Sequence, residues 1–352
     1  MGLIRFLFAM SVLSFHLNHL LPYILFNESV AVSSFFIMSG FYMALVLEKK
    51  YVKKDASYWL FISNRLLRIY PIYLITLLVT VLFILLKYFF HIGSADNSIT
   101  HYFLYANQEN INLLERINFV LRNLTLMITT DYLHFGSQTA GFFIVQQAWT
   151  LQIELLFYFL VPFLLRLKKP FFLLAITLYL SYFFLFIFHH PFSANSLILS
   201  FLLYFIFFLI GIASYFLYQK TSGLFRHSRL PQIVLAVFSL YIIFYQYIPL
   251  QLGRTALSNS NLIFYLLFSL ALPLIFISSQ KSRIDHLLGQ LSYPIYIIHL
   301  FFIKLFMNIH PLNNVLLAFS IIISTIIASL MLVYYVENPI DIHRQKRLHR
   351  TK

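Results

Sequence analysis

The amino-acid sequence predicts an all-α, polytopic integral membrane protein with about ten transmembrane helices and both termini in the cytoplasm. Three observations carry this prediction. Of the 352 residues, 61% are hydrophobic and only 10% are charged, which differs strongly from the composition of an average soluble domain. Apolar runs of about 20 residues, the length that crosses a bilayer, recur along the whole chain. The positive charges fall mainly on one side of the resulting topology.

Ten segments have a length close to that needed to cross the hydrocarbon layer. Their approximate bounds are 4–26, 31–48, 67–90, 142–165, 170–188, 196–218, 231–250, 260–279, 291–308 and 315–336. The first run, RFLFAMSVLSFHLNHLLP, differs from a signal peptide because His16 and His19 interrupt it and no small-residue cleavage site follows. We therefore expect it to be retained as the first transmembrane helix.

Lysine and arginine residues orient these spans. With the N-terminus inside, 20 of the 25 Lys and Arg residues fall in cytoplasmic segments, whereas Arg116, Arg122 and Arg254 fall in outer loops. The positive-inside rule accounts for this asymmetry, and with it for most of the formal charge of +14. A nucleic-acid partner is therefore not expected. The chain has no cysteine, which excludes disulfides and thiolate chemistry.

The domain organisation follows from the same pattern. Residues 1–340 are expected to form one membrane domain, followed by a basic cytoplasmic tail at 341–352. The long outer loop at 91–141 contains a half-apolar stretch, INFVLRNLTLMIT at 117–129, which is expected to lie at the membrane interface or to re-enter the membrane. If this stretch crossed the membrane, every later charged loop would change sides and the charge asymmetry would collapse.

Ionisable residues inside the spans are the first candidates for function, because such groups are costly in a membrane. Arg5 and His16 are eleven residues apart, which places them about three helical turns and about 16 Å apart on one helix face. His16 is expected near the middle of the membrane, and His19 follows it at i+3. A topology anchor is the alternative interpretation of Arg5, and a helix–helix hydrogen bond is the alternative for His16.

A second set of cations opens the third predicted span, NRLLRIYPIYL. Arg65 and Arg68, at i and i+3, project together where a cytoplasmic anionic ligand would arrive. Anionic lipid headgroups are the alternative partners. With Arg5, these residues would form a clamp of three arginines, which suits a phosphate-rich ligand.

Glu154 is the one acidic residue deep in a predicted span, and Trp149 lies about one turn before it. An unpaired carboxylate there would be protonated or strongly destabilising, so a cationic or hydrogen-bonding partner is expected. A structural ion pair and a catalytic role are both open. The histidines outside the spans have no spacing that indicates a metal site.

Further polar groups lie on two other spans. Tyr293 and His299, in LSYPIYIIHL, lie on one helix face and form either a packed polar seam or a contact with substrate. Ser39 precedes Gly40 in FFIMSGF, and this small pair allows either close helix packing or access of a ligand to the backbone.

Six motifs together resemble the membrane-embedded acyltransferase type 3 family and occur in the order found in that family. They are Arg5 and His16 with ten residues between them, FFIMSGF at 35–41, RLLRIYP at 65–71, WTLQIELLFYF at 149–159, LSYPIYIIHL at 291–300 and VENP at 336–339. The chain departs from the family at Ile4 and Phe6, where many members carry Asp and Gly.

The resemblance implies a membrane O-acyltransferase that moves an acyl group, most often acetyl, from cytoplasmic acyl-CoA to a carbohydrate hydroxyl. The acceptor classes are a surface polysaccharide, a lipopolysaccharide or a lipid-linked glycan, and the expected location is a bacterial inner membrane. Acetyl-CoA would be a co-substrate, with no bound cofactor and no metal. The implied roles are catalysis for His16 and Glu154, donor binding for Arg5, Arg65 and Arg68, and lining of the site for Ser39, Trp149, Tyr293 and His299.

Three alternatives remain open at this point. His16 can act as a general base on the acceptor hydroxyl, or it can be acylated and relay the group. A flippase or exporter of glycolipids would also have about ten helices and buried charges, but would need no acyl-CoA. A membrane scaffold without enzymatic activity would tolerate the loss of His16, Arg65 and Arg68.

Overall fold

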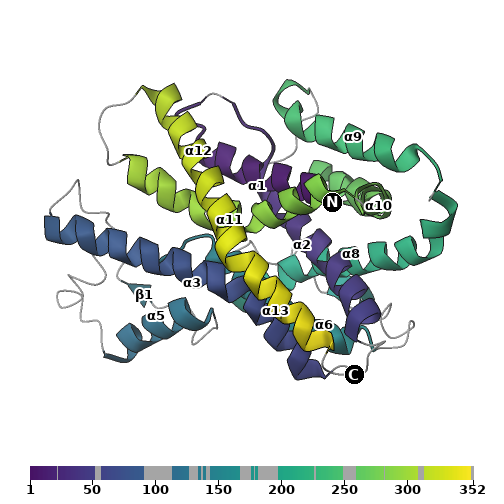
Figure 1. Cartoon of the computed structure of the whole chain (residues 1–352), viewed down its shortest axis with the longest axis horizontal. Helices are drawn as coiled ribbons and strands as arrows, with labels where there is room; N and C mark the ends of the chain where they lie inside the picture. The colour runs from purple at the N-terminus through teal and green to yellow at the C-terminus, as the bar shows by residue number, and fades with distance from the viewer. Residues whose placement is uncertain are drawn as a thin grey trace.

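The computed structural model describes residues 1–21, 23–51, 57–90, 113–126, 134–135, 138–139, 143–166, 176–177, 179–180, 197–225, 227–248, 259–280, 282–307 and 313–349. Within these ranges the chain is almost entirely α-helical (Figure 1). The helices are α1 (Gly2–His16), α2 (Glu28–Val46), α3 (Tyr58–Phe90), α5 (Leu113–Thr125), α6 (Ala148–Leu164), α8 (Leu197–Phe225), α9 (Leu230–Ile243), α10 (Asn259–Ser279), α11 (Arg283–Met307), α12 (Asn314–Leu332) and α13 (Asn338–His349). Strands β1 (His134–Phe135) and β2 (Gln138–Thr139) form a short antiparallel pair.

Five of the described helical segments are long and apolar enough to cross a membrane. These are Glu28–Tyr51, Tyr58–Phe90, Ser260–Ser279, Arg283–Met307 and Asn314–Leu348, whereas α1, α6 and α9 are shorter apolar helices. The described helices are thus compatible with a helical membrane protein, while the count of ten spans and the cytoplasmic termini remain predictions. The expected span at 170–188 lies largely outside the described residues.

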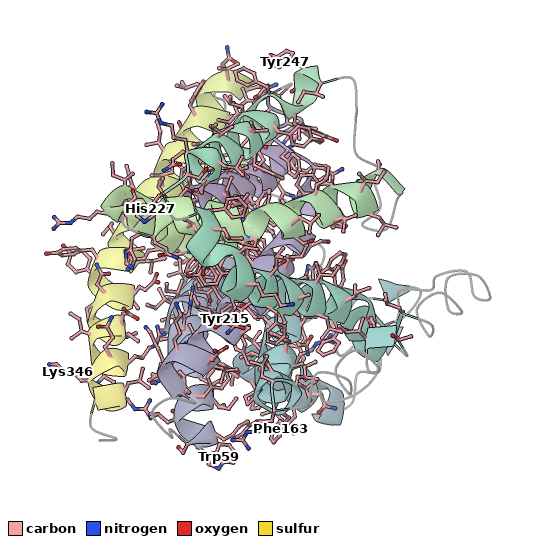
Figure 2. All side chains as sticks on the ribbon, turned by 90° about the vertical axis from the view of Figure 1, so that its right-hand side faces the viewer. Trp59, Phe163, Tyr215, His227, Tyr247 and Lys346 are labelled. Carbon is pink, nitrogen blue, oxygen red and sulfur yellow. The ribbon has the colours of Figure 1, made fainter. Side chains whose placement is uncertain are left out.

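Large apolar side chains are exposed along the outer faces of these helices, as expected where lipid replaces water. Leu78 is 59% exposed, Phe89 is 70% exposed and Leu266 is 60% exposed. At the molecule's ends, Trp59 and Phe163 project on the side opposite Tyr247 (Figure 2). Aromatic residues at both ends of a helical bundle are typical of the two membrane–water interfaces.

The first helix is shorter than the sequence predicts, because α1 ends at His16 and not near residue 26. The backbone N–H of Leu17 is shared between the carbonyls of Leu13 and Ser14, which closes the last turn. The Ser14 hydroxyl then accepts a hydrogen bond of 3.0 Å from the backbone N–H of Leu25, so the chain folds back along the helix. His16 therefore stands at the end of α1, and His19 lies in the exposed turn that follows.

The third helix begins earlier than predicted, at Tyr58 and not near residue 67. Its first turn is capped by the Ser57 hydroxyl, which accepts a hydrogen bond from the backbone N–H of Leu60 at 3.2 Å. Arg65 and Arg68 consequently lie two to three turns inside α3. Pro71 is accommodated within the helix without ending it.

The last helix continues through a π-helical turn at Val333–Glu337 into α13. The boundary expected at residue 340 falls inside α13. Arg347 of α13 donates hydrogen bonds to Asn64 Oδ1 at 3.1 Å and to Ser63 Oγ at 2.9 Å, which fastens α13 to α3.

Glycines allow two pairs of helices to approach closely around the site. On α2 and α8, a Cβ at Gly40 would lie 2.1 Å from the Phe208 carbonyl oxygen, and a Cβ at Gly211 would lie 1.9 Å from that of Ile37. On α1 and α11, a Cβ at Gly2 would lie 1.6 Å from the Asp285 carbonyl oxygen. Small residues at helix crossings are the usual means of close packing in membranes. The sequence predicted this packing as one of two roles for Gly40.

The N-terminal end of α1 is fixed to the start of α11 by Asp285. The carboxylate accepts hydrogen bonds from the backbone N–H groups of Gly2 at 2.7 Å and Leu3 at 2.9 Å, and it forms an ion pair of 3.0 Å with the Met1 ammonium. Burial lowers the pKa of this ammonium, and Asp285 opposes part of that effect. A carboxylate at a helix N-terminus also stabilises the helix dipole, so the position of α1 along α11 is well defined.

The half-apolar stretch at 117–129, in the loop expected on the outer side, lies partly in helix α5 (Leu113–Thr125), and its residues 127–129 fall outside the described residues. One face is buried through Phe119 and Asn123, while Val120 and Leu124 are exposed at 43% and 48%. The Tyr73 hydroxyl of α3 donates a hydrogen bond to the Asn123 carbonyl oxygen, which attaches α5 to the bundle. A helix with an exposed apolar face fits the predicted interfacial position, which remains a prediction.

Candidate active site

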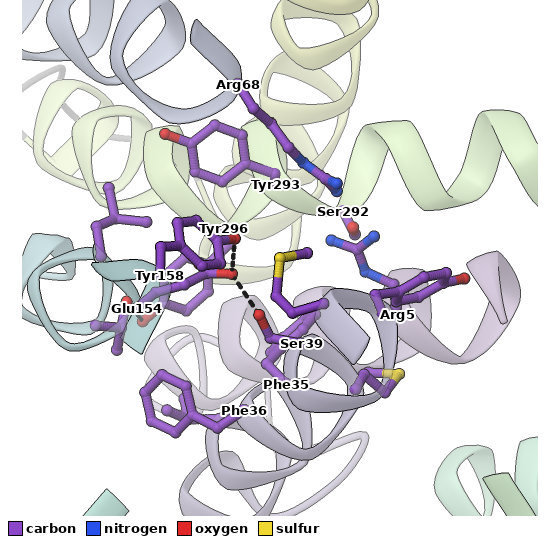
Figure 3. A pocket seen from close by; sticks show the side chains of 16 residues that line it. Arg5, Phe35, Phe36, Ser39, Arg68, Glu154, Tyr158, Ser292, Tyr293 and Tyr296 are labelled. Atoms are coloured by element: carbon purple, nitrogen blue, oxygen red, sulfur yellow. Dashed lines mark hydrogen bonds between the residues drawn. The ribbon is translucent and has the colours of Figure 1, made fainter. Parts of the chain in front are cut away.

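A small cavity lies where α1, α2, α3, α6 and α11 meet, and we call it the arginine cavity (Figure 3). Its volume is about 80 Å³. It is lined by Arg5, Val32, Phe35, Phe36, Met38, Ser39, Tyr42, Met43, Arg68, Thr150, Leu151, Glu154, Tyr158, Ser292, Tyr293 and Tyr296.

Two arginines occupy one end of the arginine cavity. Arg5 comes from α1 and Arg68 from α3, and their guanidinium groups point toward each other beside Ser292 (Figure 3). The guanidinium carbon of Arg5 lies 5.9 Å from the centre of the Tyr42 ring. Among the described residues, neither arginine has a carboxylate oxygen within 4.0 Å. Two like charges without a close counter-ion make this end of the cavity suited to an anion.

Glu154 lies at the other end of the arginine cavity, where its partners are hydroxyl groups. Its Oε1 accepts a hydrogen bond of 2.7 Å from Ser39 Oγ and another from the hydroxyl of Tyr158. Tyr158 lies one turn after Glu154 on α6, and the spacing of four residues is a signal that sequence analysis could have used. The expectation of a hydrogen-bonding partner for Glu154 is met by these two hydroxyls.

Two tyrosines of α11 form part of the same wall. The Tyr293 hydroxyl donates a hydrogen bond of 2.7 Å to the Ile69 carbonyl oxygen, which joins α11 to α3 near Arg68. The Tyr296 hydroxyl accepts one of 3.1 Å from Thr150 Oγ1, which joins α11 to α6. Both rings are therefore held in fixed orientations by the neighbouring helices.

A larger cavity lies beyond Tyr296, and we call it the histidine cavity. Its volume is about 510 Å³. It is lined by Val12, His16, Glu28, Ser29, Val32, Phe143, Gln146, Gln147, Trp149, Tyr204, Tyr296 and Leu300. Val32 and Tyr296 belong to the linings of both cavities, so these two side chains form the partition between them.

His299 lies behind His16, with the two ring centres 5.3 Å apart. It is fully buried, and its Nδ1 lies 2.8 Å from the Tyr296 carbonyl oxygen and 3.2 Å from that of Ile295. Carbonyl oxygens only accept hydrogen bonds, so Nδ1 carries the proton in the neutral ring and Nε2 carries the lone pair. Nε2 has no hydrogen-bond partner among the described residues.

The structure thus brings most of the sequence-predicted residues to two adjoining cavities. Arg5, Ser39, Arg68, Glu154 and Tyr293 line the arginine cavity, and His16 and Trp149 line the histidine cavity.

Arg65 is not part of this arrangement, and the expected clamp contains two arginines instead of three. The Arg65 side chain packs over the Phe61 ring at 5.5 Å and is only 4% exposed. Residues three apart on a helix differ by about 60° in direction, which is enough for Arg68 to enter the cavity while Arg65 does not. Its predicted part in donor binding remains untested.

Several lining residues were not predicted from the sequence, and three polar ones are Glu28, Tyr42 and Tyr204. Glu28 begins α2 directly after the N-cap residue Asn27, and a capping signal of this type could have placed it at a helix end. Tyr42 lies on α2 one turn after Ser39, so its face could have been predicted. Tyr204 of α8 carries no signal in the sequence that distinguishes it from its aromatic neighbours.

Comparison with known proteins was consistent with these observations. A family model described as an acyltransferase domain, Acyl_transf_3, matches residues 1–334. A protein of Acidianus two-tailed virus with the name "Putative acetyltransferase ORF330" is 26% identical over 327 residues, covering 89% of this chain and 85% of the viral protein. No solved structure matches the chain.

Proposed function

Because the chain belongs to the acyltransferase 3 family, we propose that this membrane acyltransferase moves an acetyl group from cytoplasmic acetyl-CoA to a carbohydrate hydroxyl. The acceptor is a surface polysaccharide, a lipopolysaccharide or a lipid-linked glycan, and the location is a bacterial cytoplasmic membrane. One observation carries the proposal. Helix α1 presents Arg5 to a cavity where two arginines lie together with no carboxylate oxygen of a described residue within 4.0 Å, and it presents His16 to the adjoining larger cavity.

The donor is proposed to bind through its phosphates at the arginine end. Arg5 and Arg68 offer guanidinium N–H groups that form charge-assisted, bidentate bonds with phosphate oxygens. A cavity of about 80 Å³ holds a phosphate or a thioester but not a complete coenzyme A molecule. We therefore infer that most of the donor lies outside this cavity and that its acyl end is directed toward the partition at Tyr296.

His16 is proposed to act as the general base. The lone pair of one imidazole nitrogen takes the proton of the acceptor hydroxyl while the oxygen attacks the thioester carbonyl. The carbonyl carbon forms the new C–O bond, the C–S bond breaks, and the coenzyme A sulfur leaves and takes up the proton from His16. A relay through an acyl-histidine uses the same residue and the same leaving group.

His299 is proposed to orient His16. A neutral His16 that donates its one ring N–H to the unpartnered Nε2 of His299 presents the lone pair of its other nitrogen to the hydroxyl, and the ring-centre distance of 5.3 Å suits this contact. Glu154, fixed by Ser39 and Tyr158, supplies a negative charge that offsets part of the charge of the two arginines within the arginine cavity.

The proposal is tested with membranes that contain the protein, radiolabelled acetyl-CoA and the glycan fraction of the host cell. His16→Ala should abolish labelling of the glycan without lowering the amount of protein in the membrane. His19→Ala is the matched control, because His19 lies in an exposed turn three residues away, and it should retain activity. Continued acetylation by His16→Ala contradicts the proposal. A glycolipid flippase would translocate its cargo without consuming acetyl-CoA.

The acceptor itself is identified by mass spectrometry of surface glycans from cells with and without the gene. An O-acetylated glycan should gain the mass of one acetyl group per modified site only when the gene is present. An unchanged glycan profile together with acetylation of a small molecule would move the proposal to a different acceptor class.

A further inference from the structure

We propose that the histidine cavity binds one pyranose ring of the acceptor, with Trp149 and Tyr204 as a stacking wall and with Glu28 and Gln147 as ligands of the ring hydroxyls. The inference rests on the proposed function and deepens it, because it assigns a place and specificity-determining residues to the acceptor.

The size of the histidine cavity fits a ligand of this class. Its volume of about 510 Å³ lies within the range of roughly 300–1,000 Å³ that is common for small-molecule sites. The arginine cavity, at about 80 Å³, has no room for a sugar ring. Donor and acceptor are therefore assigned to different cavities on the two sides of Tyr296 and Val32.

Aromatic rings supply the apolar part of the site. Trp149 of α6 and Tyr204 of α8 lie with ring centres 5.3 Å apart and ring planes tilted by 48°. Phe143 adds a third ring to the lining. A pyranose has a face of C–H groups, and these weakly positive hydrogens are attracted to the negative face of an aromatic ring. Such a wall binds the sugar face without reading its hydroxyl pattern.

Gln147 supplies a fixed acceptor. Its Nε2 donates a hydrogen bond of 2.6 Å to the Ile297 carbonyl oxygen, which sets the orientation of the amide. Its Oε1 is buried and has no hydrogen-bond partner in the described part of the chain. Gln147 is 7% exposed and lines the cavity. A buried acceptor without a partner is rare and destabilising. Because Gln147 lines the cavity, a small shift of its side chain would expose this oxygen to a hydroxyl donor of a ligand.

Glu28 supplies a second acceptor from α2. Its carboxylate lines the same cavity and, within the described ranges, takes part in no hydrogen bond or ion pair. A carboxylate has two oxygens and accepts hydrogen bonds from two neighbouring hydroxyls at once, which matches a vicinal diol. His16 faces this cavity as well, so a ring held by Glu28 and Gln147 has its remaining hydroxyls within the cavity that contains the proposed base.

The combination distinguishes this cavity from a site for a lipid tail or for an anion. A lipid tail would leave Gln147 Oε1 and the Glu28 carboxylate without partners, and an anion would be repelled by Glu28. A neutral ligand with one apolar face and several hydroxyl donors satisfies every group on the lining. Glu28 begins α2, Gln147 is the N-cap residue of α6, which carries Trp149, and Tyr204 lies on α8, so the site forms only in the folded bundle.

The chain has two tryptophans, Trp59 and Trp149, so removal of Trp59 makes Trp149 a single fluorescent reporter inside the cavity. Trp59 is 72% exposed at one end of the molecule (Figure 2), so Trp59→Phe leaves Trp149 in the cavity as the only indole. The purified Trp59→Phe protein in detergent is titrated with methyl glycosides of glucose, galactose, mannose, rhamnose and N-acetylglucosamine. Fluorescence of Trp149 is recorded up to about 100 mM, where even a Kd of ~10 mM gives nearly full occupancy.

At least one methyl glycoside should produce a saturable change in Trp149 fluorescence, while glycerol at equal concentration should not. The Trp149→Phe protein, which retains Trp59, is the matched control and should show no saturable change. Adding Gln147→Met or Glu28→Gln to Trp59→Phe should weaken binding of that glycoside by about tenfold or more. The absence of a saturable change with all five glycosides overturns the proposal, as does an equal change in the Trp149→Phe control.

The same measurement separates this inference from the proposed reaction. Adding His16→Ala to Trp59→Phe should leave glycoside binding in place while acetyl transfer is lost. Saturable binding in a protein that transfers no acetyl group to any glycan would sustain the sugar site and reject the enzymatic proposal. Acetyl transfer without glycoside binding at Trp149 would place the acceptor outside the histidine cavity.

Discussion

Arg5 offers the sharpest test of the arginine cavity, because its guanidinium group points toward a second arginine inside a cavity that could hold an anion. Its guanidinium has no carboxylate within 4.0 Å among the described residues, and it is repelled by Arg68. Arg5→Gln removes the charge and keeps a polar side chain with a good helix propensity. We expect this variant to lose affinity for acetyl-CoA without losing stability.

The magnitude follows from the bonds that the guanidinium can form. A hydrogen bond to a charged group contributes about 1.5–3 kcal/mol, and about 1.4 kcal/mol corresponds to a factor of ten. Loss of a bidentate contact should thus raise the KM for acetyl-CoA by roughly 10- to 100-fold. Arg5→Lys keeps the charge and loses the planar fork, so its KM should rise by about tenfold at most. Because Arg5→Gln also removes a repulsion, its unfolding temperature should be unchanged or higher.

The assay is acetyl transfer in membranes at fixed acceptor concentration and variable acetyl-CoA, together with thermal unfolding in detergent. Arg283→Gln is the control, since Arg283 is exposed at the start of α11. It should leave KM and unfolding temperature unchanged. Arg5→Lys controls for topology, because a simple positive-inside anchor would tolerate lysine fully. A KM for Arg5→Gln within twofold of the unmodified protein would refute a donor role, and a large fall in unfolding temperature would indicate a structural one.

Three other substitutions test the surroundings of the two cavities. Gly211→Leu should greatly reduce the amount of protein in the membrane, measured by immunoblot, because its Cβ would lie 1.9 Å from the Ile37 carbonyl oxygen. Gly223→Leu is the control and should not reduce it, because a Cβ at Gly223 would have no atom within 4 Å. Ser39→Ala removes the 2.7 Å bond to Glu154 and should lower kcat by about tenfold, equivalent to ~1.4 kcal/mol; an unchanged kcat would make this bond irrelevant to the reaction. His299→Gln places an oxygen near the position of Nε2, whereas His299→Asn retains only the hydrogen-bond donor near Nδ1. The kcat of the Gln variant should therefore be higher than that of the Asn variant, and the opposite order would reject the orienting role.

Much of the arginine cavity could be predicted because polar groups are conspicuous in apolar helices. Arg5, Ser39, Arg68 and Glu154 stand out in spans that otherwise contain aliphatic and aromatic residues, and all four converge on one cavity. The cost of burying such groups in a membrane makes each of them a candidate without any knowledge of the fold. Their convergence on one cavity, however, depends on helix packing that the sequence does not specify.

The ends of the helices could not be predicted from hydropathy. The end of α1 at His16 depends on the hydrogen bond between Ser14 Oγ and the backbone of Leu25, and the start of α3 at Tyr58 depends on the cap by Ser57. Hydropathy measures transfer of side chains into lipid and is insensitive to such local bonds. As a result, the sequence placed His16 within a long helix, while the structure places it at a helix end beside a cavity.

The histidine cavity was harder to predict from the sequence than the helix ends, because its lining consists mostly of residue types that are common in this chain. Tyr204 is one of 24 tyrosines, and nothing in its local sequence separates it from the others. Gln147 becomes informative only when the orientation of its amide is known, since one end is bonded to Ile297 and the other is unpartnered. A site of this kind is recognised by a polar atom that has no hydrogen-bond partner in the folded state, which the sequence does not show.

The partition between the two cavities links these observations into one mechanism. Tyr296 is 9% exposed, lies 6.0 Å from the Phe35 ring and is fixed by Thr150, so the barrier is an ordered aromatic side chain. A thioester on one side would meet little water from the other side while this barrier is closed, and acetyl transfer requires the Tyr296 side chain to move so that the acceptor hydroxyl reaches the thioester. Replacing the Tyr296 ring by the smaller leucine side chain should join the cavities, and because water is then free to compete with the acceptor hydroxyl, hydrolysis of acetyl-CoA should rise relative to transfer. The ratio of free acetate to acetylated glycan measures this directly, and a ratio equal to that of the unmodified protein would show that Tyr296 does not separate donor from water.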